Sequence, residues 1–151
     1  MALEAGIIDM VVTDHSPCLP ELKRGDFFEA WGGISSLQLR LSVVLAVMQK
    51  RGFGFNQLTR WLSSAPAQLA GLQQRKGAIA PGFDADFVVW HPAFQRTITP
   101  EQLLHRHKLT PYLGRTLPGV VMATYLRGRK IYDGARVLDE PVGELLLHGR
   151  L

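Results

Sequence analysis

The stretch "DMVVTDHSPC", residues 9–18, decides how the fold of this chain is interpreted. Apolar and β-branched residues run from Ile7 to Thr13 and stop before Pro17, which predicts a short buried strand over residues 7–13. Asp14 follows this run at once. A carboxylate at the end of a strand either caps the turn by accepting backbone N–H bonds or takes part in chemistry. Taken alone, the spacing favours the capping role for Asp14.

Composition narrows the class of protein. The chain has 151 residues, 46% of them hydrophobic and 20% charged, which is typical of one ordinary globular domain or two small ones. The net charge of +4 is scattered, without a basic stripe that alternates with aromatic residues, so we expect no nucleic-acid partner. No apolar run approaches the roughly 20 residues of a membrane span, so we expect no membrane partner. The single Cys18 excludes an internal disulfide.

The N-terminus, "MALEAGIID", lacks the basic and apolar regions of a signal peptide. The sequence does not otherwise assign a compartment, and it leaves cytoplasm, mitochondrion and peroxisome open.

The two halves of the chain differ in pattern. Apolar residues recur at spacings of three and four from Ile34 to Met48, which predicts a helix that Gly52 ends. Further helices are expected from Asn56 as N-cap and from Ser64 as N-cap. After residue 75 we expect strands over residues 87–90, 120–126 and 130–132, a short helix over 100–106, and a turn at 127–129. We therefore predict an α/β segment over residues 1–75 and a β-rich segment over 76–151.

A lone buried strand leaves its backbone groups unpaired unless other strands lie beside it. Parallel strands also need crossover connections, and nothing precedes residues 7–13 that would provide one. We therefore expect the first segment to be the end of a larger α/β domain, so that the chain is truncated or a fragment.

Three stretches, taken together, resemble one family. "VVTDHSPC" with "KRGDFFEAWGGISSLQ" resembles the last-strand region of allantoinases, in the cyclic amidohydrolase superfamily. "SSAPAQLAGLQQRKGAIAPGFDADFVVWHP" resembles the end of the barrel and the return to the β-sandwich of that superfamily. "HKLTPYLGRTLPGVVMATYLRGRKIYDG" resembles its closing segment, although His107 stands where the family more often has Asn. The resemblance covers nearly the whole chain in the family's order.

The resemblance implies an α/β fold: the C-terminal part of a (β/α)8 metal-dependent hydrolase barrel over residues 1–75, and part of a small β-sandwich over 76–151. The implied reaction is hydrolysis of allantoin, a small cyclic ureide, to allantoate. The family uses a two-metal centre, usually zinc, which lowers the pKa of the attacking water and polarises the ring carbonyl. It often assembles as a homo-tetramer. Alternative substrates within the superfamily are hydantoins and dihydroorotate.

The resemblance also assigns the site residues. Asp14 matches the last metal ligand, which also carries the proton from the attacking hydroxide to the leaving nitrogen. Ser16 lies in the loop that faces the substrate, and Gly32 and Gly33 lie where the family contacts its substrate through backbone groups. Without the resemblance, Ser16 is a turn residue, and the two glycines are as readily a flexible turn before a helix.

The family's other metal ligands are a His-x-His pair, a carbamylated lysine and two further histidines, none of which is recognisable here. His105 and His107 do form a His-x-His pair, but they follow an expected helix, and a solvated or capping role is favoured for them. We therefore expect this chain to be inactive alone. The alternative is a non-catalytic isoform or pseudoenzyme that associates with full-length subunits.

Overall fold

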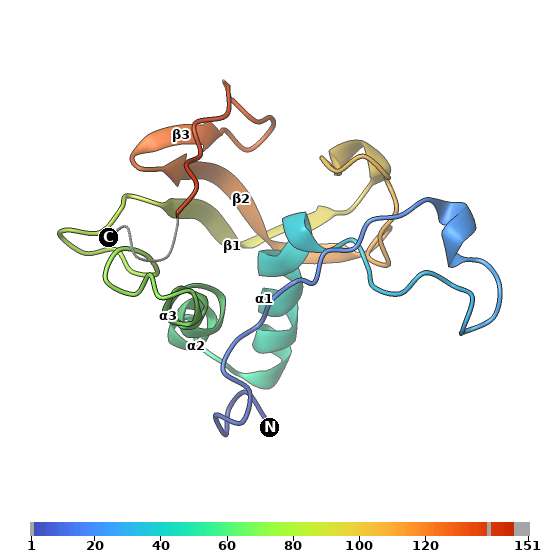
Figure 1. Ribbon diagram of the computed structural model, residues 1–151, viewed down its shortest axis with the longest axis horizontal. Helices are drawn as coiled ribbons and strands as arrows, with labels where there is room; N and C mark the ends of the chain where they lie inside the picture. The colour runs from blue at the N-terminus through green and yellow to red at the C-terminus, as the bar shows by residue number, and fades with distance from the viewer. Residues whose placement is uncertain (1, 139, 147–151) are drawn as a thin grey trace. The chain divides into compact units, whose positions relative to one another are not determined.

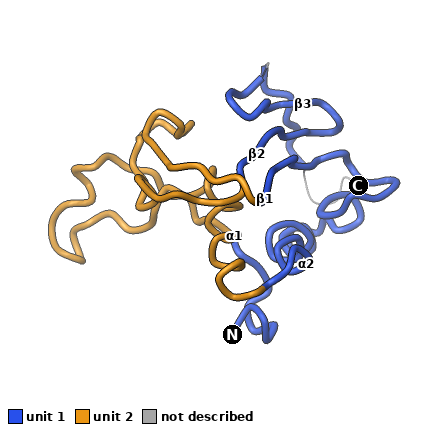
Figure 2. Tube along the Cα trace, turned by 180° about the vertical axis from the view of Figure 1, so that it is seen from behind, with its two compact units in different colours: residues 1–11, 53–92, 120–151 blue, residues 12–52, 93–119 orange. Residues whose placement is uncertain are grey.

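The computed structural model describes residues 2–138 and 140–146, and they form two compact units. Residues 1–11, 53–92 and 120–151 make up unit 1, and residues 12–52 and 93–119 make up unit 2 (Figure 2). The chain passes between the units within two of its strands, β1 (Phe87–Thr97) and β2 (Thr116–Leu126). The division into a barrel segment and a sandwich segment at residue 75 stays a prediction.

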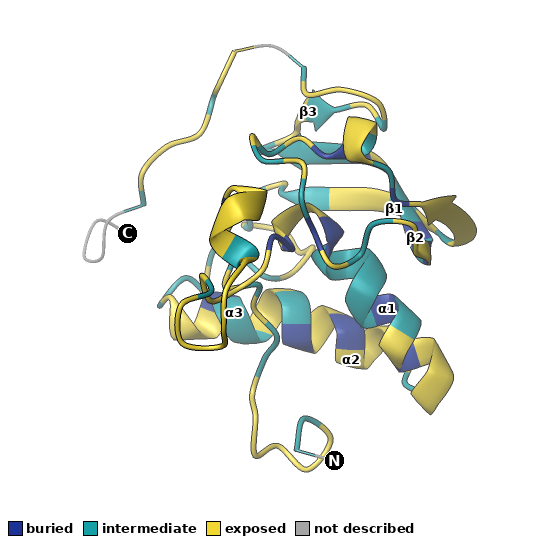
Figure 3. Cartoon of the chain, turned by 90° about the vertical axis from the view of Figure 1, so that its right-hand side faces the viewer, coloured by how far each residue is buried: buried dark blue, intermediate teal, exposed yellow. Residues whose placement is uncertain are grey.

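The main helix of unit 2 confirms the predicted one. It follows the short η1 (Pro20–Lys23) and η2 (Leu37–Leu39), and α1 runs over Arg40–Arg51. Gly52 ends α1 in the left-handed conformation at φ 72°, where its N–H donates to the carbonyls of the last turn. Helix α1 carries buried positions (Figure 3). They are Leu45 and Met48, whereas Leu37, expected on the same face, is 59% exposed.

The core of unit 2 joins this helical segment to the loop and strand residues 98–117. Its four buried members are Leu39, Ile98, Leu103 and Leu117, and Val43 and Tyr112 are among the residues that pack around them. The predicted helix over 100–106 is only the single turn η4 (Pro100–Gln102), whose capping box joins Thr99 to Gln102. The core thus fixes the helical segment that precedes and includes α1.

The helices of unit 1 form one continuous run: α2 (Phe55–Thr59), the π-turn η3 (Arg60–Ser64) and α3 (Ala65–Leu69). The predicted start at Asn56 is wrong, because Gly54 is the N-cap and its N–H donates to the Gln57 side chain at 3.1 Å. Ala65 N–H donates to the carbonyl of Arg60, five residues back, and the following Pro66 has no N–H with which to continue the α-helical pattern.

The three strands form one sheet in the order β1-β2-β3, with β3 at Arg129–Tyr132 (Figure 1). Strands β2 and β3 are antiparallel, with Leu126 opposite Arg129. The two residues between them, Arg127 at φ 47° and Gly128 at φ 80°, have the positive φ that a two-residue hairpin needs. The predicted hairpin is confirmed, and Asp86 supports its turn by accepting the Arg127 N–H at 2.7 Å.

The predicted strand over residues 7–13 is wrong for the part of the chain that the structure describes. The segment pairs with no strand, and Ile7 is 78% and Val12 62% exposed. Strand character comes from hydrogen bonds to a neighbouring strand. Here Val11 N–H donates to Trp61 O, and one isolated parallel bridge joins His15 to Ile34. Among the described residues, no helix has the length and apolar character of a membrane span.

The two aspartates of "DADF", residues 84–87, belong to an ion-pair cluster in unit 1. Lys76 Nζ lies 2.6 Å from Asp84 and also bonds Asp86, while Arg75 Nε lies 2.8 Å from Asp84. Burial lowers the pKa of Lys76, but its bonds and charge pairing with the two aspartates outweigh burial and leave that pKa raised. The bond from Lys76 holds the pKa of Asp84 below its usual value.

Removing Lys76 should change how stability depends on acid. Because the pKa of Asp84 is lower in the folded than in the unfolded protein, its contribution is present at neutral pH and is lost as pH falls through the folded value. Lys76→Met should be less stable than the parent at pH 7 and should lose less on acidification. Urea unfolding at pH 7 and at about pH 3 measures both. Lys50→Met, at an exposed position, is the control and should follow the parent curve.

Candidate functional site

Asp14 is exposed and has a strained backbone. Its φ is 42°, in the left-handed region, which costs a non-glycine residue about 1–2 kcal/mol. Among the residues that the structure describes, no donor reaches its carboxylate, so Asp14 does not cap the turn by accepting backbone N–H bonds. The carboxylate is therefore free to bind a cation or to take up a proton.

Ser16, two residues further along the same turn, has its hydroxyl occupied. Its Oγ accepts the Trp31 indole N–H at 2.9 Å and donates to Gly32 O at 3.4 Å, which is long for a hydrogen bond. Its backbone N–H donates to Ile34 O at 2.9 Å. Ser16 thus joins the turn after Asp14 to the loop that contains Gly32.

The Gly32–Gly33 pair lies directly against Ser16. A Cβ at Gly33 would lie 2.6 Å from Ser16 Cβ, and Gly33 has φ 75°, so only glycine fits there without strain. Gly32 has no atom within 4 Å of the corresponding position. Both glycines are exposed. The structure thus brings together Ser16, Gly32 and Gly33, three of the residues that the sequence singled out, beside Asp14 in the chain.

Two residues that the sequence did not single out hold this loop. Lys23 Nζ donates to Trp31 O at 2.7 Å and to Gly33 O at 2.5 Å. Trp31 is 51% exposed, and its indole N–H donates to Ser16 Oγ. Because Lys23 bonds to main-chain carbonyls, no motif in the sequence reveals its role.

His15 occupies the position between Asp14 and Ser16. Its Nδ1 accepts the backbone N–H groups of Ser36 at 3.1 Å and Leu37 at 3.2 Å. In the same region, Ser36 Oγ donates to Thr13 O at 3.0 Å. Residues 13, 15 and 16 are thus all bonded to the segment 34–37.

His105 packs edge-on against His15, with ring centroids 5.4 Å apart. Burial lowers the pKa of His105, although a hydrogen bond with the Leu109 backbone acts to raise it. The His105 Nε2 is buried with no hydrogen-bond partner among the described residues. A His-x-His metal site at His105 and His107 is not supported, because the described residues contain no group of three or more His, Cys, Asp or Glu that could hold a metal.

Asp14 fits a metal site as one hard oxygen ligand, but one carboxylate does not make a site. Catalytic zinc centres take about three protein ligands for each ion. The residues that the structure describes provide no such group, so any further ligands would have to come from beyond them.

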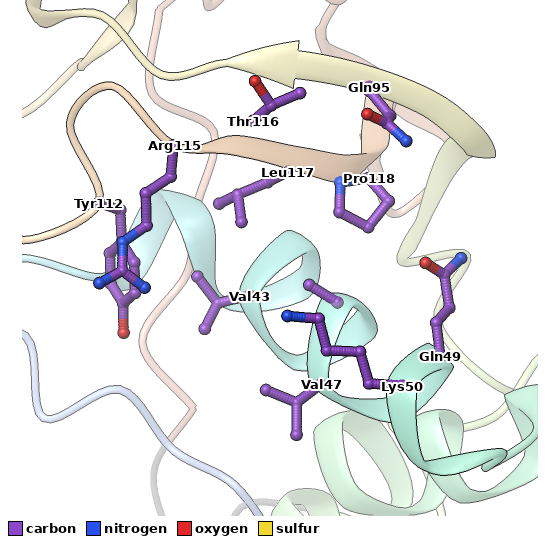
Figure 4. Close-up of a pocket in the computed structure, with 11 residues that line it drawn as sticks. Val43, Val47, Gln49, Lys50, Gln95, Tyr112, Arg115, Thr116, Leu117 and Pro118 are labelled. Carbon is purple, nitrogen blue, oxygen red and sulfur yellow. The ribbon is translucent and has the colours of Figure 1, made fainter.

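A pocket in unit 2 lies apart from these residues. Figure 4 shows it between one face of α1 and residues 112–118, with Lys50 and Arg115 as its cationic side chains. None of Asp14, Ser16, Gly32 or Gly33 lines it. The candidate site is therefore the exposed turn at 14–16 with the glycine pair, and not this pocket.

Comparisons with known proteins give a consistent family. The model of the amidohydrolase family, whose members are metal-dependent, matches residues 1–131. The chain is 49% identical to an allantoinase of Streptomyces avermitilis over 146 residues, which is 96% of this chain and 32% of that protein. It is 41% identical to an allantoinase of Saccharomyces cerevisiae over 153 residues, or 99% of this chain and 32% of that protein. The chain thus spans about a third of the length of these relatives.

Solved structures agree with this result. A dihydropyrimidinase from Brevibacillus agri superimposes with a TM-score of 0.83 at 30% identity, over 91% of this chain and 31% of that one. The expectation of part of an amidohydrolase fold is therefore confirmed, although the described segment 7–13 lacks the pairing of a strand.

Substitution at the glycine pair tests the geometry of the turn. Gly33→Ala places a Cβ against Ser16 at positive φ, so we expect the free energy of unfolding to fall by about 1–2 kcal/mol. The Trp31 indole N–H should exchange faster with solvent, because its acceptor Ser16 moves. Gly32→Ala is the matched control and should change stability by less than about 0.5 kcal/mol. Urea unfolding and NMR hydrogen exchange measure both, and equal effects at the two positions would contradict the packing described.

Proposed function

Because this chain belongs to the amidohydrolase family, we propose that it provides the last barrel segment of a cyclic amide hydrolase that acts on allantoin. One observation carries the proposal: Asp14 holds an exposed, unbonded carboxylate on a strained backbone beside the Ser16–Gly33 turn. The 41–49% identity to allantoinases supports allantoin over the hydantoin and dihydroorotate alternatives.

The proposed role of Asp14 is proton transfer. One carboxylate oxygen of Asp14 accepts a proton from the attacking water while the water oxygen bonds to the ring carbonyl carbon. The same oxygen then gives that proton to the ring nitrogen as the C–N bond breaks, so that the leaving group departs as a neutral amide nitrogen. An exposed carboxylate without a competing donor suits this task, because no internal bond must break first.

We propose zinc as the metal, with Asp14 as one ligand through its second oxygen and the other ligands outside the described residues. A bound zinc pair would polarise the ring carbonyl and lower the pKa of the water.

The glycine pair and Ser16 are proposed to bind the ureide. Gly32 and Gly33 are exposed residues whose backbone N–H groups have no acceptor among the described residues, so these groups can donate to a carbonyl oxygen of the substrate. Lys23 holds the Trp31 and Gly33 carbonyls, which keeps this backbone in place. The long 3.4 Å bond from Ser16 Oγ to Gly32 O leaves the hydroxyl able to turn toward a bound ring.

A second candidate is a non-catalytic protein that associates with full-length subunits. The exposed and mutually packed side chains of Phe27 and Phe28 favour it, because exposed large apolar side chains that lie together commonly mark an interface. The proposed enzyme needs association too, as a homo-tetramer of the kind the family forms. Activity therefore separates the two candidates, and association alone does not.

Activity of the chain, alone and in a complete barrel, tests the proposal. The purified, zinc-loaded chain should form no allantoate from allantoin, because one carboxylate does not hold two metals. Replacing the matching third of the Streptomyces allantoinase with this chain should give an active chimera. Asp14→Asn in that chimera should lower kcat by about 10²–10⁴-fold, the usual contribution of a proton-transfer group.

Asp9→Asn is the matched control, since it removes an exposed carboxylate five positions upstream and should leave kcat unchanged. An inactive wild-type chimera that folds and assembles would favour the non-catalytic candidate. Turnover by the isolated chain would contradict the assignment of missing ligands.

A further inference from the structure

The helical segment that begins at η2 has no cap of its own. Neither Ser36, before η2, nor Leu39, before α1, makes a side-chain capping bond. The first N–H groups of a helical segment need acceptors from elsewhere. Nδ1 of His15 provides one for both Ser36 N–H and Leu37 N–H, although His15 lies 21 and 22 residues before them. The cap of this segment therefore comes from the turn that holds Asp14.

These two bonds fix the state of the His15 ring. An Nδ1 that accepts hydrogen bonds carries no proton, so the neutral ring has its proton on Nε2. A ring turned over by 180° would face the two N–H groups with a carbon atom and lose both bonds. His105 packs edge-on against the ring and restricts its rotation. The imidazole is thus held in one orientation and one tautomer.

Asp14 is the one residue between Thr13 and Ser16 that makes no bond to the segment 34–37 in the described structure. Thr13 O accepts the Ser36 hydroxyl, and Ser16 N–H donates to Ile34 O. Asp adopts a left-handed backbone more readily than most non-glycine residues, but still at a cost, which contacts from its surroundings can offset. The hydrogen bonds that Thr13, His15 and Ser16 make to residues 34–37 can hold the Asp14 backbone in this conformation.

We propose that His15 is a positioning residue for Asp14. The His15 Nδ1 holds the turn against residues 36–37, so that Asp14 keeps its left-handed backbone and a free carboxylate. This inference rests on the proposed function for its catalytic consequence, and on the hydrogen bonds alone for its geometry. The role does not require His15 to touch the substrate.

Two variants separate the acceptor from mere bulk. In His15→Asn the side-chain carbonyl oxygen can take the place of Nδ1, whereas His15→Leu fills space but accepts no bond. NMR of the chain should show Ser36 and Leu37 amide protons exchanging about tenfold faster in the Leu variant, the size of one or two lost hydrogen bonds. The φ-dependent backbone coupling of Asp14 should move away from its positive-φ value in His15→Leu. It should retain that value in His15→Asn.

If His15→Leu fails to fold, a measurement on the unsubstituted chain still tests the proposal. The ¹⁵N shifts of the His15 ring should report an unprotonated Nδ1 and a protonated Nε2. A proton on Nδ1, or unchanged exchange and Asp14 coupling in a folded Leu variant, would overturn the proposal.

Kinetics in the chimera test the catalytic consequence. His15→Leu should lower kcat about tenfold or more with little change in KM, because Asp14 acts in the chemical step, and His15→Asn should retain most of kcat. Parent-like kcat in the Leu variant would overturn the positioning role. An inactive wild-type chimera that folds and assembles would count against the proposed function instead, and the NMR measurements would still decide whether His15 holds the turn.

Discussion

The backbone of residues 13–16 is bonded to residues 34–37, and the candidate site depends on this attachment. Two bonds end on the His15 imidazole, one on the Thr13 carbonyl, and one runs from the Ser16 N–H. Each is a single hydrogen bond worth about 1 kcal/mol. Together they offset the unfavourable φ of Asp14. The two His15 bonds also cap the helical segment leading into α1, so one side chain contributes to the order of both the site and the start of that segment.

Polar contacts to its backbone order much of the loop between these segments, and Cys18 is its buried apolar residue. Lys23 bonds two main-chain carbonyls, and Asp26 accepts the N–H groups of Phe28 and Glu29. Phe27 and Phe28 meanwhile point outward, at 89% and 93% exposure. The glycine pair is thus held by an ammonium and a hydroxyl.

How far the sequence predicts this structure follows from the range of each interaction. Gly52 ends α1, and Arg127-Gly128 turns the hairpin, because positive φ is a local demand that the residue itself meets. The segment 7–13 has the composition of a strand but lacks a paired neighbour, and composition cannot provide one. The resemblance grouped Ser16 with Gly32 and Gly33. It did not reveal Lys23 or the capping role of His15, because both act on main-chain atoms eight or more residues away and so leave no pattern of side chains.

The site turn and the exposed apolar segment next to it have different energetic roles. Residues 7–12 expose Ile7, Ile8 and Val12, and burying such side chains against other chain segments gives roughly 1.5–3 kcal/mol each. The turn at 13–16 presents no large apolar side chain to bury, and its bonds to residues 34–37 are already formed within unit 2. The free energy of assembly would therefore come from the apolar segment, while the geometry of Asp14 is set before assembly. Because His15 follows Asp14 directly and caps the helical segment, a shift of that segment would also move the carboxylate.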